Sequence, residues 1–200
     1  SSMKVLPTST TPAPRVDKPI VITEVTATLG TVVPEREKAA HVYKRYAVAE
    51  SHGVLASWWF VLQWVNTGEF RYCSLIDPGT GEPHEAAAAY SRLSTALQGA
   101  RFLRKADCGQ NAWVYEWEKP GRRLYVAWAE KEGAGAVAAL PCGTGTGTVT
   151  DVAGHVWDVR VAGGLTVGLR DEPLLCDLPA GGPDEPRAPS PDLPQAPVSL

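Results

Sequence analysis

Residues 18–24, with the sequence KPIVITE, constrain the fold of this chain more than any other segment. A run of apolar and β-branched residues follows Pro19 and ends on the carboxylate of Glu24. Because a nearly continuous apolar run is typical of a strand buried on both faces, the segment predicts a strand of a parallel sheet. In a parallel α/β barrel the carboxyl ends of the strands form the catalytic face, where Glu24 would stand. A solvated glutamate at a strand end is the alternative.

The following residues predict two β/α units. Pro34 fits the first turn of a helix, and apolar residues at helical spacing give that helix one apolar face. Residues 54–60 are almost entirely apolar and predict a second buried strand. Pro83 opens a second amphipathic helix, and Gly99 is a suitable stop for it. Residues 18–103 therefore predict parallel strands joined by crossover helices.

The pattern changes in the second half of the chain. Residues 113–118 and 124–128 alternate between aromatic or apolar and other residues, and Pro120-Gly121 between them predicts a tight turn. Further short strands are expected at 147–152, 156–161, 165–169 and 174–178. Residues 104–178 therefore predict a small antiparallel β-sandwich. The resulting fold class is α/β plus all-β, with a loop or frayed terminus at 1–17 and a disordered, proline-rich tail at 179–200.

Several of these segments resemble the clan A glycoside hydrolases, which are retaining (β/α)8-barrel enzymes. KPIVITEVT, at 18–26, is similar to their seventh strand, where a K-P-I-x-[IV]-T-E segment ends on the catalytic nucleophile. The segments that follow come in the order of that clan: a helix, a Trp-bearing strand, the turn SLIDPGTGEP at 74–83, and a closing helix that runs into QGARFL at 98–103. The turn TDVAG at 150–154 is similar to one that recurs in the C-terminal sandwich of the clan. The resemblance implies the last two units of a barrel followed by a β-sandwich.

The resemblance also implies roles for particular residues. Glu24 would be the nucleophile. An aromatic residue at the end of the strand at 54–60 would form the floor of the subsite that holds the sugar ring being cleaved. Trp58 and Trp59 are the candidates, and they point to opposite faces because side chains alternate along a strand. The sequence does not choose between them, and core packing of both tryptophans is the alternative.

A retaining glycosidase needs a second carboxyl group, about 5–5.5 Å from the nucleophile, as acid/base. In the clan this is a Glu after an Asn on the fourth strand, but this sequence has no Asn-Glu dipeptide and no residues for strands one to six. A full barrel takes about 250 residues. We therefore expect a fragment that carries the nucleophile and needs a missing N-terminal barrel segment as its partner. The other carboxylates considered as acid/base are Glu50, Glu69, Asp77 and Glu82. None of them lies in a motif that would place it opposite Glu24.

Composition excludes several other classes of function. The formal charge of −3 and the pI of about 5.8 give no electrostatic case for nucleic acid. No apolar run approaches about 20 residues, so no transmembrane helix is predicted. Four cysteines without C-x-x-C spacing and four scattered histidines predict neither a metal nor a cofactor, and a disulfide cannot be paired from sequence.

The function that follows is hydrolysis of O-glycosyl bonds in carbohydrate metabolism, with a carbohydrate as substrate. A non-catalytic β-sandwich accessory or carbohydrate-binding module is the alternative. The first residues lack the apolar region of a signal peptide, which leaves the location open, and the resemblance slightly favours an extracellular one.

Overall fold

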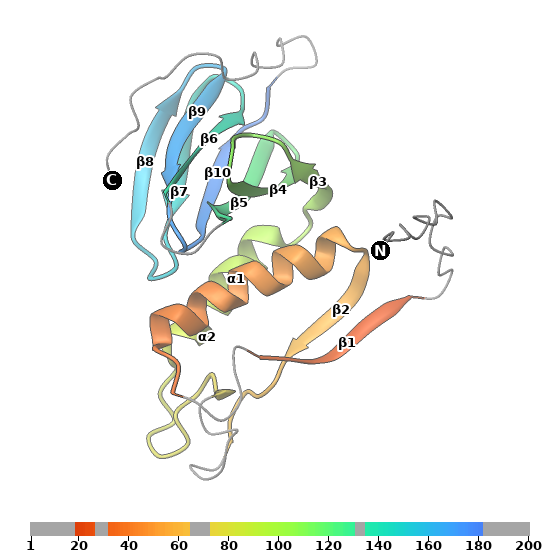
Figure 1. Cartoon of the computed structure of the whole chain (residues 1–200), viewed down its shortest axis with the longest axis vertical. Coiled ribbons are helices and arrows are strands. Elements are labelled where there is room, and N and C mark those ends of the chain that lie inside the picture. Colours follow the sequence, from red (N-terminus) through yellow and green to blue (C-terminus); the bar gives the residue numbers. More distant parts are fainter. Residues whose placement is uncertain (1–18, 27–31, 65–72, 131–134, 182–200) are drawn as a thin grey trace, which may run out of the picture.

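The computed structural model describes residues 19–26, 32–64, 73–130 and 135–181 (Figure 1). Its first half runs β1 (Ile20–Val25), α1 (Glu35–Ser51), β2 (Val54–Trp59) and α2 (Glu85–Leu97). The strand–helix–strand–helix order expected from the sequence is thus confirmed. The expected frayed terminus at 1–17 lies outside the described residues, as do residues 182–200 of the expected disordered tail. The start of that tail, expected at residue 179, is wrong, because Pro179 pairs with Arg122 as the last residue of β10 (Leu174–Pro179).

β1 and β2 form a parallel pair, with Ile20 opposite Val54 and Val25 opposite Trp59. The prediction that β1 is buried on both faces is wrong for this chain, because Ile20 and Val21 are 45% and 42% exposed. The physical reason is that the described residues give β1 one neighbouring strand and cover only one face of the pair with helices.

Both helices use the apolar faces that their sequences predict. α1 starts directly after Pro34 and carries Glu35 and Glu37 in its first turn, where negative charge stabilises the helix dipole. α2 is followed by Gly99 at φ +72°, a left-handed conformation that glycine adopts without strain. The buried apolar residues include Ala39, Tyr43 and Ala47 on α1, which are four residues apart, and Ala86, Ala89 and Leu93 on α2, which are three or four residues apart.

The second half contains only strands among its described residues. β3 (Arg101–Ala106), β4 (Ala112–Lys119), β5 (Arg122–Ala129), β10 (Leu174–Pro179), β7 (Gly145–Thr150) and β8 (Val156–Val161) form one six-stranded antiparallel sheet in that order. β6 (Ala136–Pro141) and β9 (Gly164–Leu169) form a two-stranded antiparallel sheet. The hairpin expected between 113–118 and 124–128 is confirmed as β4–β5, whereas the sequence analysis missed β3 and β6.

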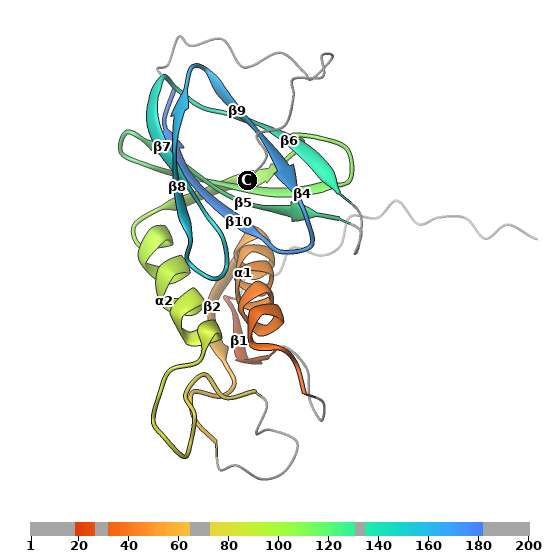
Figure 2. The ribbon, with the colours of Figure 1, turned by 90° about the vertical axis from the view of Figure 1, so that its left-hand side faces the viewer.

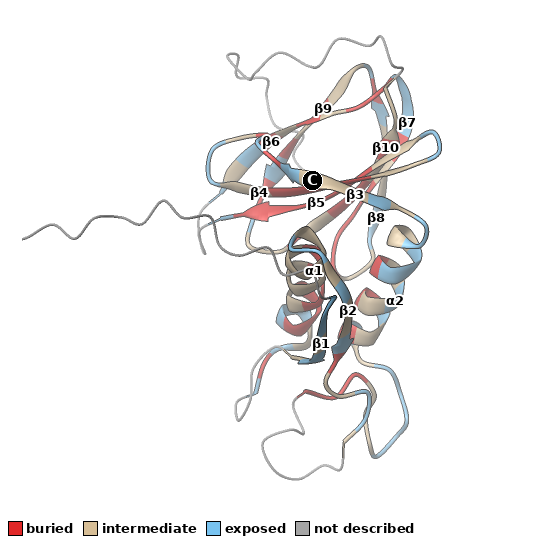
Figure 3. Cartoon of the chain, turned by 90° about the vertical axis from the view of Figure 1, so that its right-hand side faces the viewer, coloured by how far each residue is buried: buried red, intermediate tan, exposed pale blue. Residues whose placement is uncertain are grey.

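The elements stack in layers (Figure 2). α1 and α2 lie between the β1–β2 pair and the six-stranded sheet, with their apolar faces in one core that includes Trp117, Val126 and Trp128 of that sheet. A second core, built around Leu140, Val149 and Leu178, joins the two-stranded sheet to the other face of the six-stranded sheet. Figure 3 shows the contrast that results: the interior strands β4 and β5 are largely buried, and β1 is largely exposed.

Candidate active site at the carboxyl ends of β1 and β2

Glu24 and Trp58 are exposed residues near the carboxyl ends of β1 and β2. The residues that follow them, Val25 and Trp59, are opposite each other in the ladder, and the Phe60 N–H donates to the Val25 carbonyl at 2.8 Å. Val25 and Trp59 both pack into the helix-side core. Because adjacent residues of a strand point to opposite faces, Trp58 points away from the helices. A register shift between Ile22 and Val25 sets both Thr23 and Glu24 of β1 against Trp58. Glu24 is exposed, and Trp58 is 53% exposed.

Trp59 lies in the core instead. Its side chain is 8% exposed, and its indole Nε1–H donates to the Cys73 carbonyl at 2.8 Å. A buried indole needs such a partner for its N–H group. The structure therefore separates the two tryptophans that the sequence leaves equivalent.

The segment that follows Cys73 is fixed beside these strand ends. The buried Nζ of Lys38 donates to the Ser74 carbonyl at 3.3 Å and to Glu35 Oε1 at 2.6 Å. Ser74 Oγ accepts a hydrogen bond from the Trp64 N–H at 3.0 Å. Trp59 and Lys38 thus hold two consecutive carbonyl groups, those of Cys73 and Ser74, at the carboxyl end of β2.

Three of the other weighed carboxylates, Asp77, Glu82 and Glu50, lie in the described part of the chain. Asp77 Oδ1 accepts from the Thr80 and Gly79 N–H groups, both at 2.8 Å, and these bonds lower the pKa of Asp77 below its ordinary value. Glu82 is exposed in the same turn. Glu69 lies outside the described residues. Within the described part of the chain, the Glu24 carboxylate has no hydrogen-bond or ion-pair partner.

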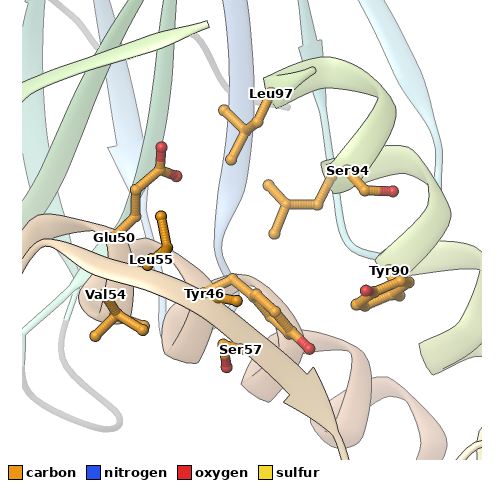
Figure 4. A pocket seen from close by; sticks show the side chains of 11 residues that line it. Tyr46, Glu50, Val54, Leu55, Ser57, Tyr90, Ser94 and Leu97 are labelled. Carbon is orange, nitrogen blue, oxygen red and sulfur yellow. The ribbon is translucent and has the colours of Figure 1, made fainter. Parts of the chain in front are cut away.

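Glu50 belongs to a different site, a cavity of about 250 Å³ between β2, α1 and α2 (Figure 4). Burial raises the pKa of Glu50, and the indole N–H of Trp117 opposes this in part. The sequence gives no signal for this cavity, because three separate elements form it. The side chains labelled in Figure 4 are Tyr46, Glu50, Val54, Leu55, Ser57, Tyr90, Ser94 and Leu97.

The described residues contain no group of three or more side chains suited to a metal ion. All four cysteines are buried, and none of them forms a disulfide in the structure. Neither described helix has the length and apolarity that a membrane-spanning helix requires.

Comparison with known proteins relates the fold to glycoside hydrolases. No family model and no curated protein matches the sequence. A GH30 endoxylanase from Clostridium papyrosolvens C71 matches 82% of this chain with a TM-score of 0.61 and 12% identity, over 42% of its own length. A glycoside hydrolase family 30 subfamily 8 xylanase from Clostridium acetobutylicum also matches 82% of the chain, with a TM-score of 0.59 and 13% identity, over 43% of its length. The chain thus spans less than half of these neighbours, and it resembles part of a glycoside hydrolase fold.

Proposed function

We propose that this chain supplies part of the active site of a retaining glycoside hydrolase, with Glu24 as the nucleophile and Trp58 as the platform for the sugar ring. The observation that carries this proposal is the pairing of Val25 with Trp59, which supports a position of Glu24 close to Trp58 at the carboxyl ends of two parallel strands, where both residues are exposed. The fold shared with two xylanases supports it.

The chemistry follows from these two side chains. A carboxylate attacks the anomeric carbon and forms a covalent glycosyl-enzyme, which water then hydrolyses. The exposed face of an indole packs against the apolar face of a sugar ring while its edge stays accessible to polar groups. Glu24 is exposed, which is compatible with attack on a bound sugar.

In this proposal the acid/base and the remaining strands of the barrel come from polypeptide that this sequence does not contain. The chain spans 42% and 43% of the two xylanases, which supports this. The exposed apolar side chains of the pair also support it, because further strands would bury Ile20, Val21 and Leu55. Residues 18–103 would then be the last β/α units, and 104–178 the appended sandwich.

A role as a carbohydrate-binding module has less support. Such a module needs exposed aromatic faces, and the largest aromatic stack of the described sheet is Trp113, Tyr115 and Trp128. Tyr115 and Trp128 are only 1% and 6% exposed. Lys105 covers Trp113, with its Nζ 3.2 Å from the ring centroid.

The test replaces Glu24 in a longer polypeptide, which consists of this chain and the residues encoded immediately upstream of it. Glu24→Gln keeps the shape but removes the attacking charge, so turnover of an aryl xyloside should fall by orders of magnitude. Azide should restore part of the turnover of Glu24→Ala and give a glycosyl azide. Glu82→Gln, at an exposed carboxylate of a turn, is the matched control and should keep full activity.

The 200-residue chain by itself should be inactive, because its sequence has no Asn-Glu dipeptide to supply the acid/base. Turnover by the purified chain, or full activity of Glu24→Gln in the longer polypeptide, would contradict the proposal.

A further inference from the structure

A second cavity lies between α1 and the end of β5. Its volume is about 530 Å³, which falls within the range of about 300–1,000 Å³ typical of small-molecule sites. α1 forms one wall, and the facing wall consists of the end of β5 and residues 171–172, which precede β10. Figure 2 shows this arrangement, with α1 below β5 and β10. The described lining includes no residue of β1 or β2, so the cavity is separate from the candidate active site.

An ion pair holds the two walls together. Arg36 Nε and Nη2 on α1 donate to the two carboxylate oxygens of Glu172 at 2.6 and 2.7 Å. Ala40 of α1 and Trp128 of β5 also belong to the same hydrophobic core. A site whose walls are already in place binds a ligand at a smaller entropic cost than a site that must form on binding.

The α1 wall presents both donors and acceptors. Glu37 and His41 lie one helical turn apart, with Glu37 Oε1 3.7 Å from His41 Nε2, and Lys44 follows on the next turn. Burial and the neighbouring charge of Arg45 lower the pKa of His41 below its ordinary value, and Glu37 opposes this in part. A neutral imidazole has one donor and one acceptor nitrogen, whereas a carboxylate only accepts. This wall therefore suits a ligand group that can both donate and accept.

The facing wall adds a further acceptor and a further donor. Glu130 is exposed directly after β5, and its backbone N–H donates to the Asn111 carbonyl at 2.6 Å, which fixes its position. Trp128 lines the cavity although its side chain is only 6% exposed. Its indole N–H donates to none of the described residues, and a buried indole needs an acceptor for this group. An oxygen atom of a ligand would supply one.

We propose that this cavity binds a neutral sugar unit. A hydroxyl group both donates and accepts, so a sugar can donate to the carboxylates of Glu37 and Glu130 and accept from the indole N–H of Trp128. A cationic ligand would satisfy the carboxylates and leave the indole N–H without an acceptor. An anionic ligand would be repelled by the carboxylates on both walls. The inference does not use Glu24 and is independent of the proposed function.

Recognition at this site differs from that of a carbohydrate-binding module with an exposed aromatic platform. Trp128 is too deeply buried for a sugar ring to stack on its face. Specificity therefore comes from the spacing of the hydroxyl groups of the ligand. The cavity holds roughly one or two sugar rings, which makes a disaccharide a suitable probe.

The experiment measures binding of xylobiose to the 200-residue chain by saturation-transfer NMR. Every protein carries Trp58→Ala, which removes the sugar platform of the proposed function, so binding at that platform does not contribute. Xylobiose should bind with a Kd on the order of 1 mM. Glu37→Ala and Glu130→Ala should each weaken binding about tenfold, because each removes a charged hydrogen-bond acceptor. Circular dichroism checks that both variants, which change exposed carboxylates, remain folded.

Two controls accompany these variants. Glu82→Ala removes an exposed carboxylate from a turn outside the cavity and should leave the Kd unchanged. Sorbitol has hydroxyl groups without the fixed spacing of a ring, and it should bind at least about tenfold more weakly than xylobiose.

Three results would overturn the inference: no saturation transfer to xylobiose at about twenty times the expected Kd, an unchanged Kd in Glu37→Ala and Glu130→Ala, or equal binding of sorbitol. Binding of lysine amide in place of xylobiose would show a site for cations, and it would overturn the inference as well. Full activity of Glu24→Gln in the longer polypeptide would contradict the proposed function and leave these results unaffected.

Discussion

Val25 and Trp59 face each other across the parallel ladder of β1 and β2, and the Phe60 N–H donates to the Val25 carbonyl at 2.8 Å. A register shift between Ile22 and Val25 precedes this pair. The shift sets both Thr23 and Glu24 of β1 against Trp58. Trp58 is exposed, whereas Trp59 belongs to the core.

The first prediction separates the two tryptophans by stability. Trp59→Ala should lower the free energy of unfolding by about 3–5 kcal/mol, because it empties a core position and removes the hydrogen bond to Cys73. Trp58→Ala should change it by no more than about 0.5 kcal/mol, because the side chain is 53% exposed. Urea denaturation followed by circular dichroism measures both, and similar losses for the two variants would contradict the assignment.

Local patterns predict the helices and the β4–β5 hairpin well. Apolar residues such as Val42 and Leu93 recur at helical spacing, and the central turn residues Pro120-Gly121 separate two alternating segments, so each signal lies within a few neighbouring residues. β6 was missed because AVAALP is rich in alanine, which is depleted in strands. β3 was missed because RFLRKA directly follows a helix, and only its pairing with β4 identifies it as a strand.

The candidate site could be predicted only in part. KPIVITE identifies Glu24 as a strand-end carboxylate, since that is a property of one segment. The choice of Trp58 depends on the register between two strands, which no local pattern encodes. The Glu50 cavity depends on three elements at once, and its polar groups, Tyr46 and Ser57, look like ordinary residues of a helix and a strand.

The second prediction concerns the turn at Asp151, which joins the sheet to the helix layer. Asp151 Oδ1 accepts from the Gly154 and His155 N–H groups at 2.8 and 2.9 Å, and Oδ2 lies 2.9 Å from His155 Nδ1 and 3.4 Å from Arg36. Burial disfavours the charged form, but the hydrogen bonds from His155 and Gly154 outweigh it and hold the pKa of Asp151 below its usual range.

Because its folded pKa is depressed, Asp151 contributes stability that is present above the unfolded value of about 4 and is lost as the pH falls through the folded value. Asp151→Asn keeps the acceptor and removes the charge. It should therefore cost about 1 kcal/mol at pH 7 and progressively less as the pH falls below about 4. Urea unfolding across that range measures the difference, and a cost that does not depend on pH would refute the explanation.

The third prediction concerns close packing of β7 on β10. A Cβ added to Gly147 would lie 2.7 Å from the Asp177 carbonyl oxygen and 2.7 Å from Leu178 Cδ2. Gly147→Ala should therefore destabilise the chain by about 1–3 kcal/mol through overpacking. In a chain of this size each kcal/mol lowers the Tm by about 2–4 °C. Gly135→Ala, where the nearest atom is 3.9 Å away, is the control, and equal Tm values for the two variants would contradict the packing described.

The last prediction concerns association of the isolated chain. Ile20, Val21, Leu55 and Trp58 are 45%, 42%, 72% and 53% exposed on the two strands of the β1–β2 pair, which also has free edges among the described residues. An exposed apolar edge strand without charge is a template for pairing between copies. The purified chain should therefore self-associate in a concentration-dependent way, as measured by sedimentation velocity at micromolar concentrations.

Leu55→Lys places a charge on that strand without touching the core, so it should shift the population towards monomer with little change in Tm. Val137→Lys is the matched control, because Val137 is 47% exposed on β6, in the two-stranded sheet, and it should leave association unchanged. A chain that stays monomeric up to about 100 μM, or one that Val137→Lys dissociates as well as Leu55→Lys does, would show that the β1–β2 pair is not the contact surface.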